Sequence, residues 1–287
     1  MHRLPTLALG LIARLPLRVL QALGSVLGWA IYGMSPTYRR HLRANLAQAG
    51  LPLPARDAAR LRRAAIAAAG RMLLELPAIW FRPLPQVVSL VRRAEGLEAV
   101  LAARDAGRAL VFLTPHMGCF EIAAQYATRH MPITVLYRRP KIAWLDPLMR
   151  AGRAREGVRL AAVGFGGVRQ LFAALRRGEA VGLLPDQVPG VGEGEWADFF
   201  GRPAYTMTLA ARLSARENVA CFLAYARRLP RGAGYEIVVR PLSGQRPGET
   251  GARHINRALE ALVRECPEQY LWGYNRYKTP RGVAPPT

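Results

Sequence analysis

The sequence predicts an α/β fold: a mixed, largely parallel sheet flanked by helices, with an N-terminal helical membrane-associated segment. Three observations lead to this prediction. From about residue 109 onward, short apolar runs alternate with amphipathic stretches, which is the pattern of strand–helix–strand units. Residues 4–34 are largely apolar and are interrupted by Arg14 and Arg18. The length of 287 residues suits one substantial domain, or at most two.

The N-terminal segment is borderline for crossing a membrane. Its longest stretch without a charge, Val19–Met34, has 16 residues, whereas a spanning helix needs roughly 20. No small-residue cleavage site follows a short apolar core, which argues against a signal peptide. We expect residues 1–34 to be a signal anchor or an interfacial helix whose basic flank stays cytoplasmic, followed by a domain over residues 35–287. The alternative is an ordinary buried helix.

The secondary structure follows from the spacing of the apolar residues. Helices are expected at 37–48 and 56–76, after which Pro77, Pro83 and Pro85 break the pattern. A Gly/Glu/Pro-rich loop at 185–195 leaves the carboxyl end of a strand, a usual place for a site in such sheets. The expected strands are 109–114, 133–137, 160–163, 180–184, 219–226 and 235–240. The expected helices between and after them are 119–129, 145–156, 168–177, 206–217 and 253–266.

The charge is strongly positive, with 41 Lys and Arg against 19 Asp and Glu, a net charge of +22. Such a field attracts polyanions. Residues 1–110 hold 16 arginines and 5 acids beside the apolar N-terminus, which favours an anionic membrane surface. Interleaved aromatic and basic residues of a nucleic-acid module are absent, so no nucleic-acid partner is expected. An arginine- and alanine-rich coding bias is the competing explanation.

Cysteine and histidine spacing argues against a metal site. The three cysteines are scattered and read as free thiols of a reducing compartment, and the five histidines are equally dispersed. The pair His116 and Glu121 is different. On a continuous helix the two would lie about 140° apart. They can meet if His116 sits in the turn after a strand and Glu121 in the first turn of the next helix, as Thr-Pro before His116 and Gly118 after it suggest. A carboxylate on one imidazole nitrogen would leave the other free as a base.

The segments around this pair resemble the bacterial lipid A biosynthesis late acyltransferases, the lauroyl/myristoyl transferase family of the glycerolipid-acyltransferase-like superfamily. That family typically has His-x-Gly-Asn-Trp-Glu where this chain has His116-Met-Gly-Cys-Phe-Glu121. Cys119 and Phe120 therefore depart from the pattern, as does Tyr274, where a histidine is common. The resemblance covers about residues 35–280 and includes the segments at 38–46, 137–140, 145–148, 153–157, 184–190, 199–206, 267–272 and 276–278.

The resemblance implies an O-acyltransferase that takes a fatty acyl chain from an acyl carrier protein thioester. His116 would deprotonate a hydroxyl of a lipid A precursor in lipopolysaccharide biosynthesis, and Glu121 would hold His116. No cofactor is expected. The enzyme would act at the cytoplasmic face of the cell inner membrane, on an anionic glycolipid acceptor. Arg138, Arg153 and Arg155 are candidates for the oxyanion or a lipid phosphate, and Asp186 and Gln187 are expected to form part of the substrate site.

Three other interpretations stay open. A related enzyme could acylate a lysophospholipid, an ornithine lipid or a polyene-type metabolite with the same His116 and Glu121 pair. A thiol nucleophile at Cys119 is a weaker reading, because no family signature accompanies it. A basic, non-catalytic membrane- or nucleic-acid-binding protein, with a structural His116, is the remaining class.

Overall fold

A seven-stranded sheet forms the centre of the computed structural model, which describes residues 3–140 and 142–286. The strands are, in chain order, β1 (Val91–Glu95), β2 (Ala109–Leu113), β3 (Ile133–Tyr137), β4 (Val158–Ala162), β5 (Ala180–Leu183), β6 (Gly194–Phe199), β7 (Arg202–Met207), β8 (Val219–Arg228) and β9 (Tyr235–Pro241). The order in the sheet is β1-β9-β8-β2-β5-β3-β4, and β6 and β7 form a separate hairpin. Strands β8, β2, β5, β3 and β4 run parallel, whereas β9 is antiparallel to β8. The expected mixed, largely parallel sheet is confirmed.

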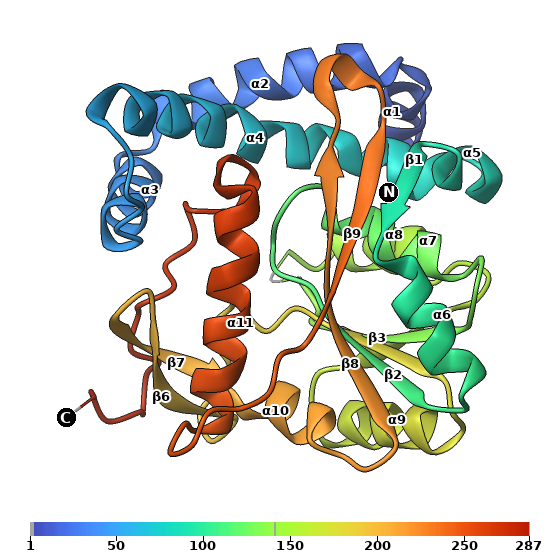
Figure 1. Ribbon diagram of the computed structural model, residues 1–287. Helices are drawn as coiled ribbons and strands as arrows, with labels where there is room; N and C mark the ends of the chain where they lie inside the picture. The colour runs from blue at the N-terminus through green and yellow to red at the C-terminus, as the bar shows by residue number, and fades with distance from the viewer. Residues whose placement is uncertain (1–2, 141, 287) are drawn as a thin grey trace.

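Helices cover both faces of this sheet (Figure 1). They are α1 (Arg3–Arg14), α2 (Leu17–Met34), α3 (Pro36–Gln48), α4 (Ala55–Phe81), α5 (Leu84–Val88), α6 (Leu97–Asp105), α7 (Phe120–Ala127), α8 (Leu145–Arg153), α9 (Phe165–Arg176), α10 (Thr208–Ser214) and α11 (Gly251–Glu265). In β2, Val111 and Leu113 belong to the core beneath α9, α10 and α11, while Leu110 and Phe112 belong to the core beneath α6 and α7. Because both faces are covered, β2 and β5 are apolar at every position.

The N-terminal helices form a layer with α4 at one end of the sheet (Figure 1). Helix α2 packs along α4 through glycines: a Cβ at Gly70 would lie 2.0 Å from the carbonyl oxygen of Gly24, and one at Gly28 would lie 2.2 Å from that of Ile66. A bend of 119° separates α1 from α2. By length and composition one helix, α4, could cross a membrane, or two if the bent pair is one span, and 61% of the apolar window of α4 is buried.

A buried charge pair ties this layer to the sheet. Arg228 of β8 donates to Glu75 of α4 at 2.8 and 2.9 Å, and both side chains are almost fully buried. Gln21 of α2 donates to Glu75 at 2.8 Å, and Arg228 also donates to the carbonyl of Gly118 at 2.8 Å. Removing one partner of such a pair typically costs about 3–5 kcal/mol, since the other charge stays buried. Helix α2 therefore contributes to a polar cluster inside the protein, and the expected domain boundary after residue 34 remains a prediction.

The structure differs from the sequence-based expectation in several places, and the short helices α5 and α6 were not expected. Helix α4 continues through Pro77 to Phe81, and the carbonyl that loses its helical partner belongs to Leu73, on the exposed side where water can serve it. Strand β1 was not expected, because it is an edge strand whose charged residues lack an apolar pattern. The segment expected to be a loop up to residue 195 and a helix from 206 instead enters the β6–β7 hairpin at Gly194, and α10 begins at Thr208.

Candidate active site

The site lies where the central parallel strands end. Strands β2 and β5 pair with Leu113 opposite Leu183, and the chain continues three residues beyond each to His116 and Asp186. The Nδ1 atom of His116 lies 2.8 Å from Oδ1 of Asp186, and the backbone N–H of His116 donates to Oδ2 at 2.8 Å. The register of the two strands therefore brings together residues 70 positions apart in the sequence.

The turn after His116 is fixed from both sides. Gly118 has a φ of 58°, and a Cβ there would lie 1.9 Å from the carbonyl oxygen of Ala226, so this position requires glycine. The N–H of Cys119 donates to that same carbonyl at 2.9 Å. On the other side, the N–H of Leu271 donates to the carbonyl of His116 at 3.0 Å. The end of β8 and the C-terminal segment thus hold the backbone that carries the imidazole.

Among the residues that the structure describes, no hydrogen bond joins Glu121 to His116, and this corrects the expectation that its carboxylate holds the imidazole. Glu121 lies in the first turn of α7 as expected, but its carboxylate accepts hydrogen bonds from Arg153 Nε at 2.9 and 3.0 Å, from Arg153 Nη2, and from Trp80 Nε1 at 3.1 Å. The physical reason is that Asp186 reaches Nδ1 from the neighbouring strand, and Arg153 binds the Glu121 carboxylate in a bidentate pair.

The remaining ring nitrogen of His116 faces Gln187. An ionised carboxylate can only accept hydrogen bonds, so Nδ1 of His116 carries a proton, and in the neutral imidazole Nε2 keeps its lone pair. Gln187 Nε2 lies 3.1 Å from His116 Nε2, so the amide donates to this lone pair. Phe120 packs edge-on against the imidazole, with ring centroids 4.9 Å apart. His116 Nε2, the nitrogen that could serve as a base, is therefore held in a defined orientation. A substrate hydroxyl can reach it by displacing the Gln187 amide.

The electrostatics of Asp186 favour its ionised form. Its side chain is buried, and burial acts to raise the pKa, but the His116 ring, the His116 backbone N–H and the charge of Arg276 act more strongly in the opposite direction. The pKa of Asp186 is therefore held below its usual range. Arg276 itself is buried against Thr206 and the carbonyl of Tyr205.

An open pocket of about 1330 Å³ lies in front of His116. Glu121, Arg138, Arg153 and Gln187 line it, and Arg138 is exposed at its rim. Arg155 does not belong to the lining. It donates instead to the carbonyl oxygens of Ile79 and Arg82 at the end of α4, at 3.1 and 2.6 Å. Its guanidinium serves the last carbonyls of a helix, and the expectation that Arg155 binds substrate stays a prediction.

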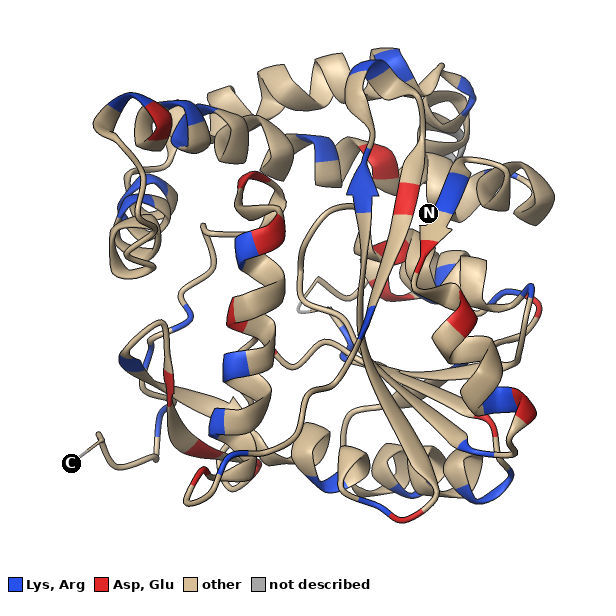
Figure 2. Cartoon of the chain, viewed as in Figure 1, with Lys and Arg blue, Asp and Glu red and all other residues tan. Residues whose placement is uncertain are grey.

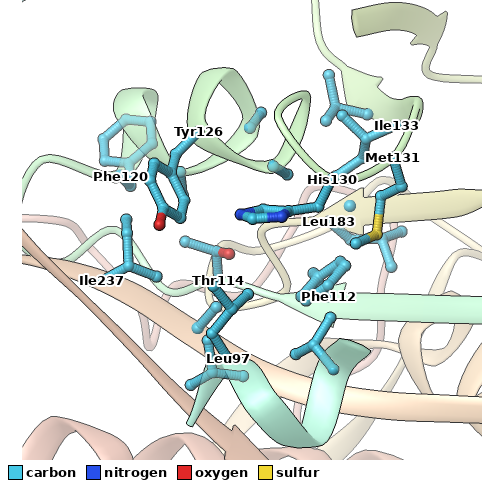
Figure 3. A pocket seen from close by; sticks show the side chains of 18 of the residues that line it. Leu97, Phe112, Thr114, Phe120, Tyr126, His130, Met131, Ile133, Leu183 and Ile237 are labelled. Atoms are coloured by element: carbon cyan, nitrogen blue, oxygen red, sulfur yellow. The ribbon is translucent and has the colours of Figure 1, made fainter. Parts of the chain in front are cut away.

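A second, apolar cavity lies between α7 and the sheet (Figure 3). It shares four lining residues with the open pocket: Phe120, Ala124, Val135 and Leu184. Phe112, Met131 and Ile133 form part of its wall away from these shared residues. The imidazole therefore lines the polar, arginine-lined opening, and Phe120, which packs against it, also lines the apolar cavity.

Cys119 is unsuited to the nucleophile role considered for it. The side chain is buried, and burial together with the charge of Glu75 raises the pKa of the thiol well above its usual value. The reactive thiolate is thereby disfavoured. Among the residues that the structure describes, no group of three or more His, Cys, Asp or Glu is arranged to hold a metal ion.

Sequence reasoning missed Trp80 and underestimated Tyr274. Trp80 comes from the end of α4, beyond the proline expected to stop that helix, and donates to Glu121. The phenol of Tyr274 accepts the backbone N–H of Val188 at 3.0 Å and so holds the turn that carries Gln187. Neither contact has a local sequence signal, because each joins segments more than 40 residues apart.

Fold and site together define a class: an α/β enzyme with an oriented imidazole at the junction of a polar opening and an apolar cavity. The chain matches the model of the family described as bacterial lipid A biosynthesis acyltransferase over residues 4–279. It is 26% identical over 219 residues to the lipid A biosynthesis lauroyltransferase of Escherichia coli K12 (75% of this chain, 71% of the relative), and 28% identical over 216 residues to the palmitoleoyltransferase of the same organism (73% and 69%). Its identity to the E. coli K12 myristoyltransferase is 28% over 192 residues (64% and 58%).

The chain therefore belongs to the bacterial lipid A biosynthesis acyltransferase family and is an O-acyltransferase. The expected family resemblance is confirmed.

The lowered pKa of Asp186 predicts a pH-dependent contribution to stability. An ionised Asp186 stabilises the fold fully above about pH 4, the ordinary pKa of an aspartate, and this stabilisation is lost as the pH falls through the lowered folded pKa. We expect wild type to exceed Asp186→Asn in unfolding free energy near neutral pH, with the difference shrinking below about pH 4. Urea unfolding of both proteins at a series of pH values from neutral to below about pH 4 measures this difference.

The matched control is Asp105→Asn, which removes an exposed carboxylate at the end of α6. It should change the unfolding free energy by less than about 0.5 kcal/mol. A wild-type advantage over Asp186→Asn that stayed constant down to about pH 2 would contradict the ionic origin of the stabilisation.

Proposed function

We propose that this enzyme moves a fatty acyl chain from an acyl carrier protein thioester to a hydroxyl of a lipid A precursor, at the cytoplasmic face of the inner membrane. The observation that carries the proposal is the position of His116, with Asp186 on Nδ1, in the open pocket and against Phe120, which also lines the apolar cavity. The acyl chain occupies the apolar cavity, and the acceptor enters through the arginine-lined pocket. The family and the names of the relatives support the choice of acceptor.

In the proposed mechanism, the acceptor hydroxyl displaces the Gln187 amide from His116 Nε2 and donates its proton there. The hydroxyl oxygen attacks the thioester carbonyl carbon, and Asp186 stabilises the imidazolium that forms. The tetrahedral intermediate then collapses, the carbon–sulfur bond breaks, and the imidazolium returns the proton to the departing thiolate. The products are an ester and the free carrier thiol, so His116 ends neutral.

The Glu121 and Arg153 pair has a different proposed role. Arg153 lies on the pocket wall with its guanidinium 5.9 Å from the ring centroid of Trp80 and 5.6 Å from that of Tyr137. The two carboxylate oxygens of Glu121 fix its orientation and, despite burial, raise the pKa of Arg153. We assign Arg153 to an anionic group, either the oxyanion or a lipid phosphate, and Glu121 to positioning Arg153.

Charge supports an anionic donor and acceptor. Arg138 and Arg139 are exposed at the rim of the pocket, and no hydrogen bond or ion pair within the described residues engages either side chain. An acidic carrier protein and a phosphorylated glycolipid would both be drawn to them. We propose that these two arginines guide the carrier-bound donor to His116.

The N-terminal helices provide the proposed membrane contact. One face of α2 packs on α4, whereas Leu23, Val26 and Trp29 are 48%, 68% and 45% exposed on the other. Figure 2 shows that this outer surface of α2 carries almost no charge, while arginines gather at both ends of the helical layer. The bend after α1 and the packing of α2 favour an interfacial helix over a spanning one, so we propose that residues 1–34 lie in the headgroup region.

The base assignment predicts that His116→Ala loses nearly all transfer. A general acid–base group typically accelerates a reaction by about 10²–10⁴-fold, so the turnover number of the variant should be lower than that of wild type by a factor in this range. Purified enzyme is given acyl carrier protein thioesters with either a lipid A precursor or a lysophospholipid, and products are read by mass spectrometry. His41→Ala, in α3 away from the pocket, is the control. Near-wild-type turnover in His116→Ala would refute the mechanism, and transfer to the lysophospholipid alone would favour the alternative acceptor.

Carrier steering predicts a salt dependence that differs between donors. Exposed charges are screened beyond about 8 Å at physiological ionic strength, so kcat/KM for the carrier-bound donor should fall as salt rises. The same chain on a short neutral thioester should respond much less. Arg139→Ala should lower kcat/KM for the carrier-bound donor by about tenfold at low salt. Arg176→Ala, an exposed arginine at the end of α9, serves as control. Identical salt curves for both donors would exclude carrier docking at this rim.

The interfacial role of α2 predicts weaker vesicle binding when its outer face is charged. Val26→Glu should lower the partition coefficient onto vesicles containing phosphatidylglycerol by at least about tenfold, because burial of one such side chain is worth about 1.5–3 kcal/mol. Ala215→Glu, at the end of α10 on the opposite side of the molecule, adds the same charge as a control (Figure 1). Unchanged binding of Val26→Glu, measured by co-sedimentation, would exclude this face as the membrane contact.

A further inference from the structure

The apolar cavity beside His116 contains three polar side chains with no protein partner. Its lining is otherwise formed by aliphatic, aromatic, glycine and methionine residues. Thr114, Tyr126 and His130 are the exceptions. His130 Nε2 is buried without a hydrogen-bond partner, and within residues 3–140 and 142–286 no hydrogen bond engages the Thr114 hydroxyl or the phenol of the half-buried Tyr126. The Nε2 atom of His130 is fully buried, and Thr114 is only 8% exposed.

These groups face the same part of the cavity. Thr114 follows the end of β2, two residues before His116, and its backbone N–H pairs with Leu183. Tyr126 lies on α7 and His130 just beyond its end. Figure 3 shows Thr114 on the sheet side and Tyr126 and His130 on the helix side, with their side chains directed into the space between. The Tyr126 and His130 rings also contact each other edge-on, with centroids 5.6 Å apart.

An unsubstituted chain would leave these groups without partners. A buried hydroxyl or imidazole nitrogen that loses water without gaining a hydrogen bond is destabilising, and a site built around a substrate hydroxyl rejects the analogue that lacks it. Burial, with the charges of Arg129 and Arg104, lowers the pKa of His130, so its imidazole is neutral at neutral pH and suits a neutral partner. The chemistry therefore matches an alcohol and not a carboxylate or phosphate.

We infer that the cavity selects an acyl chain carrying a hydroxyl group, bound by Thr114, Tyr126 and His130. Because Thr114 follows β2 directly and precedes His116 by two residues, we place the hydroxyl toward the thioester end of the chain. A 3-hydroxyacyl thioester fits this position, with its hydrocarbon tail against the apolar remainder of the wall. The inference rests on the proposed acyl transfer and adds the chemical class of the chain transferred.

The test is a competition between matched donors. Wild-type enzyme receives equimolar 3-hydroxyacyl and unsubstituted acyl carrier protein thioesters of equal length, from ten to sixteen carbons, and the two products are counted by mass spectrometry. We expect a kcat/KM ratio of at least about tenfold in favour of the hydroxylated chain, since one hydrogen bond to an otherwise unpaired buried group is worth about that factor. A ratio near one, or a preference for the plain chain, would overturn the inference while leaving acyl transfer standing.

Two near-isosteric variants locate the recognition. Tyr126→Phe and Thr114→Val should each lower kcat/KM for the hydroxylated donor and raise it for the plain one, so that the ratio falls about tenfold. Ile237→Val, which alters the same wall without changing its polarity, should change both donors by the same factor. A preference retained in both polar variants would exclude Thr114 and Tyr126 as its origin. Failure of wild type with every donor would instead refute the proposed function.

Discussion

The register between β2 and β5 is the constraint on which the candidate site depends. Parallel strands end at the same edge of a sheet, so residues equally far beyond a paired position meet there. His116 and Asp186 are each three residues beyond the pair Leu113 and Leu183, and the carboxylate takes both the ring N–H and the backbone N–H of His116. A shift of one residue in this register would move side chains from one core to the other, so that Leu110 and Phe112 would exchange places with Val111 and Leu113. The packing of the core determines the strand register and thereby the position of the His116 imidazole relative to Asp186.

The buried pair of Glu75 and Arg228 extends this constraint to the layer of N-terminal helices. One carboxylate accepts from α2 through Gln21 and from β8 through Arg228, and Arg228 continues to the carbonyl of Gly118. The outer helix, the long helix beneath it and the turn after His116 are therefore joined by consecutive hydrogen bonds. An interfacial α2 placed in this way would hold the mouth of the pocket at a fixed height relative to the membrane, which suits an acceptor that stays embedded in it.

The two cavities that meet at Phe120 separate two kinds of recognition. Arginines line the open pocket, and Glu121 holds the guanidinium of one of them, Arg153. The inner cavity is apolar except for three neutral polar side chains. Charged groups act at a distance and govern encounter, while a buried hydroxyl discriminates only on contact. In the proposed function the anionic acceptor enters the open pocket and the acyl chain of the donor occupies the apolar cavity, so each substrate meets the kind of recognition that suits it.

Much of the fold could be predicted from the sequence. The apolar runs at 109–114, 133–137 and 180–184 belong to strands covered on both faces, and their apolar character identifies them as strands without knowledge of the strands they pair with. The position of His116 in a turn after a strand was also determined locally, by Thr114, Pro115 and Gly118. Contacts between distant segments were not. The carboxylate that binds His116 comes from Asp186 and not from the nearer Glu121, since strand register decides which side chain reaches Nδ1. Likewise, only the tertiary structure pairs Glu121 with Arg153 and Trp80. It also brings Thr114, Tyr126 and His130 into one cavity. The residues of each set come from different elements, and the packing of these elements, which no periodic pattern in the sequence reveals, determines how they approach one another.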